Sequence, residues 1–199
     1  MGDIDLRAVK YLDEVAKTLE KMEKDFPFKA NEIVAALLKA RDTGRRVYIC
    51  GNGGSASTAS HMASDLNKGA NRADAPRFRA VALTDNIPAM LAWANDASYD
   101  DIFVEQLKNH LEPGDVVIGI SGSGNSPNIL KVMHYANDNG ALTIGLTGFD
   151  GGKLAQLAKI VYVVPNSCMQ QVEDVHLLVE HMISLVLRDS AECAGKAKG

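Results

Sequence analysis

The stretch "DVVIGISGSGNSPNIL", residues 115–130, joins an apolar run to a helix-like segment through six consecutive glycine, serine or asparagine residues. The run at 115–120 is short and rich in β-branched residues, as expected of a buried strand. Pro127 stands where the next helix should begin, a position that favours proline. A turn needs only one or two such small residues. The junction therefore offers many hydroxyls and backbone N–H groups at a helix start, which suits an anionic ligand.

The same alternation of strand and helix runs through most of the chain. Helical patterns follow or precede further apolar runs, which predict strands at 45–50, 78–83, 141–147 and 159–165. Such alternation predicts an α/β fold with a parallel sheet that is covered by helices on both faces. Ligands of these sheets bind outside the carboxyl ends of the strands, where we also expect the glycine- and serine-rich loops.

Two amphipathic helices are expected ahead of the first strand, at about 4–24 and 30–42, with Pro27 between them. Neither carries a motif, so we expect them to pack on the domain or on another subunit. We expect a single domain over residues 1–190, with residues 1–42 forming these helices, and a flexible tail over 191–199.

The composition limits the classes of partner. The 199 residues are 46% hydrophobic and 23% charged, which is typical of one globular domain. The net charge of −4 argues against a nucleic-acid partner. The sequence shows no apolar run of roughly 18 residues, so no membrane partner is expected. Three widely spaced cysteines form no disulfide pattern, and the N-terminal sequence does not resemble a signal peptide, so we expect a cytoplasmic location.

Two loops of small residues are candidates for ligand binding: "GNGGSAS" at 51–57 and "SGSGNS" at 121–126. Neither fits the nucleotide P-loop pattern, and the first also fails the dinucleotide pattern because Ala56 replaces its last glycine. We therefore expect no nucleotide cofactor. Hydroxyls and backbone N–H groups without a fixed cation suit a monophosphate ester. The alternative is that each loop is only a tight turn with a helix-capping serine.

Histidines and carboxylates recur at helical spacing. His61 and Asp65 lie four positions apart, and Glu173 and His181 lie eight apart on the last expected helix. Two histidines and two carboxylates could bind Zn²⁺ or a similar ion, could act as general acid and base, or could be surface or interface residues. His176 and Glu180 are also four apart, and there we expect an ordinary pair on the helix surface.

Several motifs in this order resemble one family. "GNGGSA", "SGSGNS" and "LTGFDGG", with "NDASYDDIF" between them and "VEDVHLLVEH" near the end, resemble the SIS (sugar isomerase) domain and its phosphoheptose isomerase branch. The resemblance extends to Leu187. It implies a flavodoxin-like five-stranded sheet and a homotetramer with active sites at subunit interfaces. It also implies a ketose–aldose isomerase that converts sedoheptulose 7-phosphate to D-glycero-D-manno-heptose 7-phosphate through an enediol.

The resemblance also assigns roles to residues. Asp65 and His181 would transfer protons, and His61, Asp65, Glu173 and His181 would hold zinc, one ion per subunit. Asp96 follows the second strand and is expected near the sugar. The expected substrate-binding set, most of it around the phosphate, is Asn52, Gly53, Ser55, Asp96, Ser121, Gly122, Ser123, Asn125 and Ser126.

Two positions depart from the family pattern. Asp65 stands where the family has glutamate, and Glu173 stands where it has glutamine. Aspartate reaches roughly 1.5 Å less far, and a misplacement of about 1 Å can cost on the order of 100-fold in rate. The alternative function is therefore a non-catalytic SIS protein that binds a sugar phosphate or a protein partner, such as the bacterial replication initiator. The presence of His181 favours the enzyme.

Overall fold

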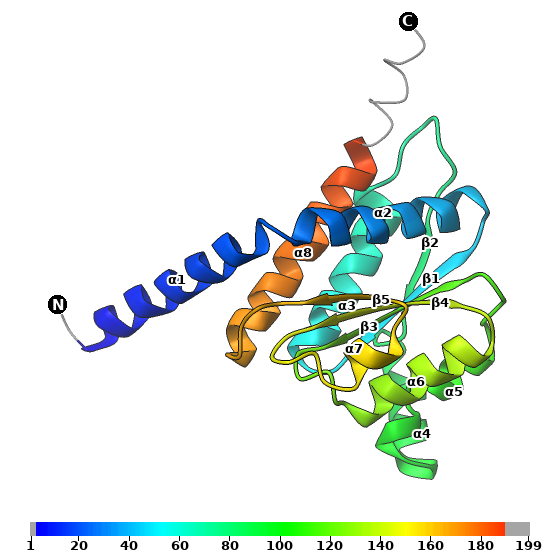
Figure 1. The fold of residues 1–199 in the computed structure, drawn as a ribbon. Coiled ribbons are helices and arrows are strands. Elements are labelled where there is room, and N and C mark those ends of the chain that lie inside the picture. The colour runs from blue at the N-terminus through cyan, green and yellow to red at the C-terminus, as the bar shows by residue number, and fades with distance from the viewer. Residues whose placement is uncertain (1–2, 190–199) are drawn as a thin grey trace, which may run out of the picture.

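The computed structural model describes residues 3–189, which form a five-stranded parallel sheet between two layers of helices (Figure 1). Across the sheet the order is β2-β1-β3-β4-β5, the order of flavodoxin-like folds. The expected fold class is therefore confirmed. The strands are β1 Arg46–Gly51, β2 Arg79–Ala82, β3 Val116–Ser121, β4 Leu142–Thr147 and β5 Ile160–Val163.

The central strands are covered on both faces. Every residue of β3 is buried, and so are the last five residues of β1. Neighbouring positions serve different layers, because Val117 packs into one core cluster and Ile118 into the other. A strand with no face toward water has no need of polar alternation, which explains the continuous apolar runs in the sequence.

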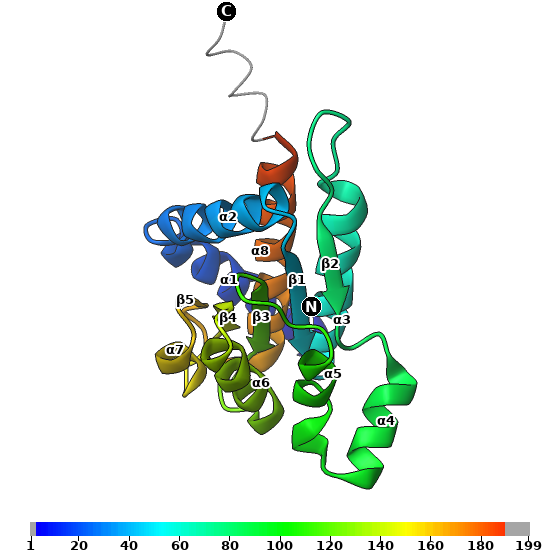
Figure 2. The ribbon, with the colours of Figure 1, turned by 90° about the vertical axis from the view of Figure 1, so that its right-hand side faces the viewer.

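Each face of the sheet has its own helices (Figure 2). One core cluster contains Leu37, Met62 and Val179, from α2 (Phe26–Asp42), α3 (Gly54–Ser64) and α8 (Met169–Asp189). The opposite cluster contains Leu107, Met133 and Leu154, from α5 (Val104–Lys108), α6 (Pro127–Asp138) and α7 (Leu154–Leu157). The elements that carry His61 and His181 therefore share one face, and the helix that follows the serine loop lies on the other.

The start of α2 differs from the sequence expectation. The helix begins at Phe26, with Pro27 in its first turn, and not near residue 30. Proline is tolerated there because N–H groups in the first turn of a helix make no intrahelical hydrogen bond, so the N–H that proline lacks is not needed. The residues expected to form a flexible tail, 191–199, lie outside the part of the chain that the structure describes.

Two helices leave apolar side chains in contact with water. Helix α1 (Asp3–Met22) extends away from the sheet, and its residues Ile4 and Leu12 are 82% and 68% exposed (Figure 1). Helix α4 (Ile87–Asp96) has no buried residue, and Ile87 and Leu91 are exposed on it. Apolar faces of this kind mark surfaces that another molecule covers. None of the helices within residues 3–189 is both long and apolar enough to cross a membrane.

The winding of the chain reverses between β1 and β3. From β1 the chain passes to β2 on one side and later to β3 on the other, and β1 and β3 pair directly. Gly51 at the end of β1 lies opposite Ile120 at the end of β3. The two small-residue loops therefore leave the sheet side by side, at the crevice where such folds bind ligands.

Candidate functional site

The two loops are tied together by a pair of amides. The side chain of Asn52 donates to Asn128 Oδ1 at 2.9 Å, and the side chain of Asn128 donates back to Asn52 Oδ1 at 2.8 Å. Asn128 is buried in the first turn of α6, and Tyr99 adds a third contact by donating its hydroxyl to Asn52 Oδ1. Asn128 and Tyr99 were not predicted from the sequence. Only the sheet topology, which brings the two loops together, makes them recognisable.

The serine loop presents two hydroxyls at the start of α6. Ser121 Oγ and Ser126 Oγ lie 3.0 Å apart. Ser126 is the residue before the helix, and its side chain makes no capping bond to the described backbone. Pro127 has no N–H and the N–H of Ile129 donates to Asn128 Oδ1 at 2.9 Å, so the N–H of Asn128 faces the loop without a capping side chain, and the helix dipole adds partial positive charge there. This arrangement suits a phosphate group.

Glycine is needed for the shape of this loop. Gly124 has φ of +65°, and a Cβ at that position would collide with the carbonyl oxygen of Gly151. The loop after β4 supports it, because the N–H groups of Gly148 and Leu154 donate to the carbonyls of Gly122 and Gly124. The loop is therefore held in one conformation by the neighbouring chain.

Other predicted substrate-binding residues take different positions. Ser55 is buried in the first turn of α3, two residues after Gly53, whose φ is +55°. Asn125 is used by the loop itself, since its side chain donates to the carbonyl of Ser123 and accepts from the N–H of Lys153. Asp96 lies exposed at the end of α4.

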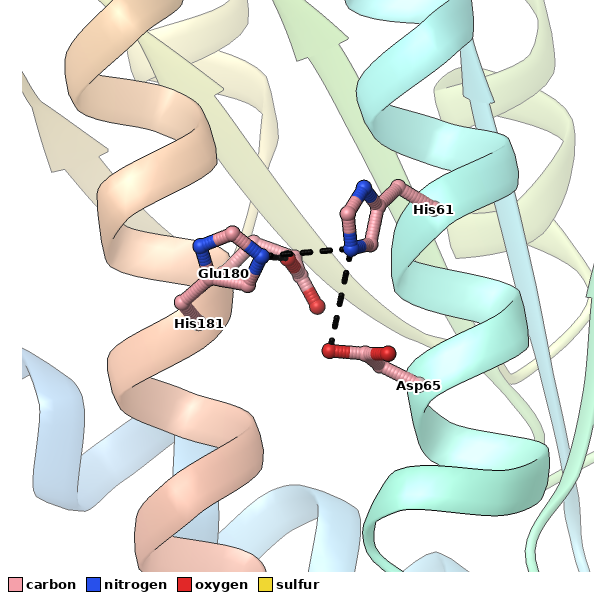
Figure 3. Close-up of side chains that lie close together, drawn as sticks. All are labelled: His61, Asp65, Glu180 and His181. Atoms are coloured by element: carbon pink, nitrogen blue, oxygen red, sulfur yellow. Dashed lines mark hydrogen bonds and ion pairs between the residues drawn. The ribbon is translucent and has the colours of Figure 1, made fainter.

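A second group of polar side chains lies between α3 and α8 (Figure 3). His61 comes from the end of α3, Asp65 from the turn directly after it, and Glu180 and His181 from the middle of α8. The Nε2 atoms of His61 and His181 are 3.1 Å apart, and Asp65 Oδ2 lies 3.9 Å from His61 Nε2. Both histidine side chains are almost half exposed, so this group can reach a ligand in solvent.

The helix changes its period at Asp65. Residues Asp65–Gly69 form a π-helical turn, η1, directly after α3. The sequence predicted that His61 and Asp65 share regular helical spacing. A π-turn widens the helix and is frequent at functional sites. It begins at Asp65, where the resemblance leads us to expect glutamate, so the reach of this carboxylate depends on the π-turn as well as on the length of the side chain.

Glu173 does not join the group that contains His61 and His181. Its carboxylate packs against Gly54 in the first turn of α3, where a Cβ would collide with it. The fourth member of the group is Glu180. The expectation that His176 and Glu180 form a surface pair was wrong, because they are 1% and 0% exposed. Helical spacing alone could not tell which pair on α8 is buried, because Glu173 with His181 and His176 with Glu180 each combine a carboxylate and a histidine.

Burial perturbs both residues of this second pair. It raises the pKa of Glu180, and the nearby charge of Asp65 raises it further. Burial lowers the pKa of His176 to about 4. His176 Nε2 lies 3.2 Å from the carbonyl oxygen of Thr147, to which it donates, and its Nδ1 has no partner among the described residues. His176 therefore fixes α8 to the end of β4, beside the serine loop.

His176 should make the fold sensitive to mild acid. Its pKa is about 4 in the folded chain against 6.5 ordinarily. Between pH 6.5 and pH 4, His176 is therefore protonated in the unfolded chain and neutral in the folded chain. Stability is fully present above pH 6.5 and is lost as the pH falls toward 4. The loss approaches about 1.4 kcal/mol per pH unit. We expect His176→Gln, which can still donate to Thr147, to flatten this dependence.

The measurement is urea unfolding between pH 7 and pH 5 with a chelator present, so that bound metal does not contribute. His134→Ala, at an exposed histidine on α6, is the matched control. An unchanged slope in His176→Gln would contradict the role given to His176.

The two parts of the site are separated along α3. From Gly54 at the loop to His61 the helix rises about 10 Å. Along this helix His61 lies about two turns and Asp65 about three turns from Gly54.

Comparisons with known proteins agree on one family. Residues 10–148 match the SIS domain family. The chain is 38% identical over 175 residues to a phosphoheptose isomerase of Aliarcobacter butzleri, covering 88% of this chain and 90% of that one. It is 39% identical over 158 residues to the phosphoheptose isomerase of Rhodospirillum rubrum, covering 79% and 82%. The solved phosphoheptose isomerase of Neisseria gonorrhoeae superposes with a TM-score of 0.86 at 29% identity, covering 92% and 98%.

Proposed function

Because the chain belongs to the SIS domain family and, within it, to the phosphoheptose isomerases, we propose that it interconverts sedoheptulose 7-phosphate and D-glycero-D-manno-heptose 7-phosphate. The reaction is an aldose–ketose isomerisation through an enediol. The observation that carries the proposal is the pairing of a phosphate-sized serine loop with a group of histidine and carboxylate side chains.

The serine loop is proposed to hold the phosphate. The hydroxyls of Ser121, Ser123 and Ser126 would donate, together with backbone N–H groups at the start of α6. Ser55 and the backbone at Gly53, at the start of α3, would add donors from the neighbouring strand end. The phosphate is thereby bound apart from the reacting carbons, so that binding and chemistry use different residues.

The proton transfer is proposed for Asp65 and His181. Starting from the ketose, a base removes a proton from C1, the enediol forms, and a proton is returned to C2. Asp65 fits the base, because a carboxylate can take and return the same proton. His181 is suited to be the acid that moves protons on and off the oxygens of C1 and C2, because imidazole transfers protons near neutral pH. Zn²⁺ is proposed at this group, where it would polarise the carbonyl oxygen.

We further propose that residues 1–190 form one domain and that the enzyme is a cytoplasmic homotetramer. The exposed apolar residues of α1 and α4 support the assembly, since each helix lacks cover in the single chain. An interface could also bring the serine loop of one subunit near the acid–base group of another. The free thiols of Cys50 and Cys168 support a reducing compartment.

Light scattering tests the assembly. We expect the mass of four chains at micromolar concentration. Replacing exposed Ile4 and Leu12 of α1 by serine should shift the protein toward smaller species, because it removes apolar area from the proposed interface. The same double change at Lys10 and Lys17, on the same helix, serves as a control. A wild-type monomer would contradict the proposal.

The activity is tested by following conversion of sedoheptulose 7-phosphate beside C5 and C6 ketose phosphates, with and without added Zn²⁺. We expect turnover to be fastest with the seven-carbon sugar. The shorter reach of Asp65 favours one alternative, a non-catalytic SIS protein. Tight binding of sugar phosphates without turnover of any of them would support that alternative and contradict the isomerase.

A further inference from the structure

We propose that Tyr99 is a specificity-determining residue, whose phenolic oxygen accepts a hydrogen bond from a hydroxyl group of the bound sugar. The inference rests on the proposed function, since it requires that a sugar phosphate binds at the serine loop. It goes beyond that function because it gives a role to a residue that the sequence motifs did not select. The argument starts from the direction of the hydrogen bonds between the two loops.

A backbone group fixes the orientation of both amides that join the loops. The N–H of Ile129 donates to Asn128 Oδ1 at 2.9 Å. Because a backbone N–H can only donate, the atom of Asn128 that it meets must be the oxygen and not the nitrogen. The nitrogen of Asn128 therefore faces Asn52 Oδ1 and donates to it at 2.8 Å, and the nitrogen of Asn52 donates back at 2.9 Å. Only one orientation of each amide satisfies all three bonds.

This orientation decides what the hydroxyl of Tyr99 can do. The hydroxyl lies 3.0 Å from Asn52 Oδ1, an atom that carries no hydrogen. The hydrogen of the Tyr99 hydroxyl must therefore point at Asn52. A tyrosine hydroxyl has a single hydrogen, so its oxygen can offer only lone pairs to any further partner. Toward a ligand, Tyr99 is thus an acceptor.

Tyr99 is both accessible and held in place. The residue is 58% exposed. It begins the short turn η2 (Tyr99–Asp101), which is fixed to α6 by an ion pair of 2.5 Å between Asp101 and Lys131. Ile102, directly after the turn, is buried in the core. An exposed side chain on a fixed backbone suits ligand recognition, because little freedom is lost when the ligand binds.

The position of Tyr99 suits the sugar better than the phosphate. Its partner Asn52 directly precedes Gly53, and Asn128 follows Ser126 by two residues, a span of at most about 7 Å. The hydroxyl of Tyr99 therefore lies beside the loops proposed to hold the phosphate. A phosphate dianion has only acceptor oxygens, which the lone pairs of Tyr99 would repel. The hydroxyl groups of a sugar can donate, so the chemistry selects the part of the ligand that carries them.

The experiment compares two phosphate esters by calorimetry on the full-length protein. One is the heptitol 7-phosphate obtained by reducing the carbonyl of sedoheptulose 7-phosphate, which keeps the hydroxyl groups and cannot isomerise. The other is ethyl phosphate, which carries the same charged group and no hydroxyl on carbon. Tyr99→Phe removes only the phenolic oxygen. It should weaken binding of the heptitol phosphate about fivefold to tenfold, the effect of one hydrogen bond between neutral groups. Affinity for ethyl phosphate should stay within about twofold.

The second ligand separates sugar recognition from support of the loop. If Tyr99 only held Asn52 in place, Tyr99→Phe would disturb the loop that both esters use, and both would bind more weakly by the same factor. Tyr135→Phe is the matched control, because it removes the hydroxyl of a half-buried tyrosine on α6. It should change neither affinity. Tyr99→Phe keeps the ring of an exposed residue, so an unaltered circular dichroism spectrum is expected.

Three results would overturn the proposal: unchanged affinity for the heptitol phosphate in Tyr99→Phe, an equal loss for both esters, or no binding of the heptitol phosphate by the wild type. The proposed isomerase is tested separately, since these ligands are not converted. An active wild type with unchanged affinities in Tyr99→Phe would leave the isomerase standing and remove the role of Tyr99. An inactive wild type with a loss confined to the heptitol phosphate would have the opposite meaning.

Discussion

Replacing His181 by alanine is expected to lower the turnover of sedoheptulose 7-phosphate by about 100-fold or more, the usual contribution of a positioned acid or base. Asp65→Ala should have an effect of the same size. His181 Nε2 lies 3.1 Å from His61 Nε2, and both side chains are accessible from solvent. Affinity for the sugar phosphate should change little, because the phosphate is proposed to be bound separately, by the serine loop.

Steady-state kinetics with the seven-carbon substrate provides the measurement. The control is His134→Ala, which removes an exposed histidine from α6, on the opposite face of the sheet. Activity should be unaffected there. If the wild type isomerises well and neither His181→Ala nor Asp65→Ala slows it, the acid–base assignment is wrong.

Asp65→Glu tests the geometry more directly, because it gives this position the side-chain length that the resemblance to the family implies. The π-turn at Asp65–Gly69 sets the backbone from which this carboxylate extends. An active wild type with a much slower Asp65→Glu would mean that the turn and the shorter side chain are matched. A weak wild type that gains activity in Asp65→Glu would mean that the chain has moved away from the heptose isomerase role.

The fold was predictable because its signals are local. The run at 115–120 and its neighbours are apolar, β-branched and short, which is typical of strands buried on both faces. The two loops at 51–57 and 121–126 were placed correctly for the same reason, since parallel strands end at one edge. The start of α2 was placed too late, because Pro27 was taken as a break when it is compatible with a first turn.

The candidate site was only partly predictable, because it depends on how two helices face each other. The spacing placed His61 beside Asp65, as the structure has them. It could not show whether Glu173 or Glu180 of the last helix lies beside these two residues. The rotation of α8 on the sheet decides this, and it turns Glu180 inward while Glu173 meets Gly54. The link between Asn52 and Asn128 was missed for a similar reason, since those residues lie 76 positions apart.

The serine loop carries the second large effect that we predict. Ser121→Ala combined with Ser126→Ala should weaken binding of the sugar phosphate about 100-fold. A hydrogen bond to a charged group contributes about 1.5–3 kcal/mol, and loss of two at the lower value gives about 3 kcal/mol, with each factor of ten worth about 1.4 kcal/mol. The fold should survive, since the Ser126 side chain makes no capping bond to the described part of α6.

Calorimetry measures this effect best in the His181→Ala background, where the bound sugar phosphate should be converted about 100-fold more slowly. The same sugar without its phosphate is the control ligand, and its weak binding should be equal with and without the serine changes. Because the Ser121 and Ser126 hydroxyls lie 3.0 Å apart, their removal acts on one point of the ligand. If affinity for the sugar phosphate is unchanged in a folded variant, the loop is only a turn between β3 and α6. The phosphate would then have to be held by the first loop, at Gly53 and Ser55, on the strand beside it.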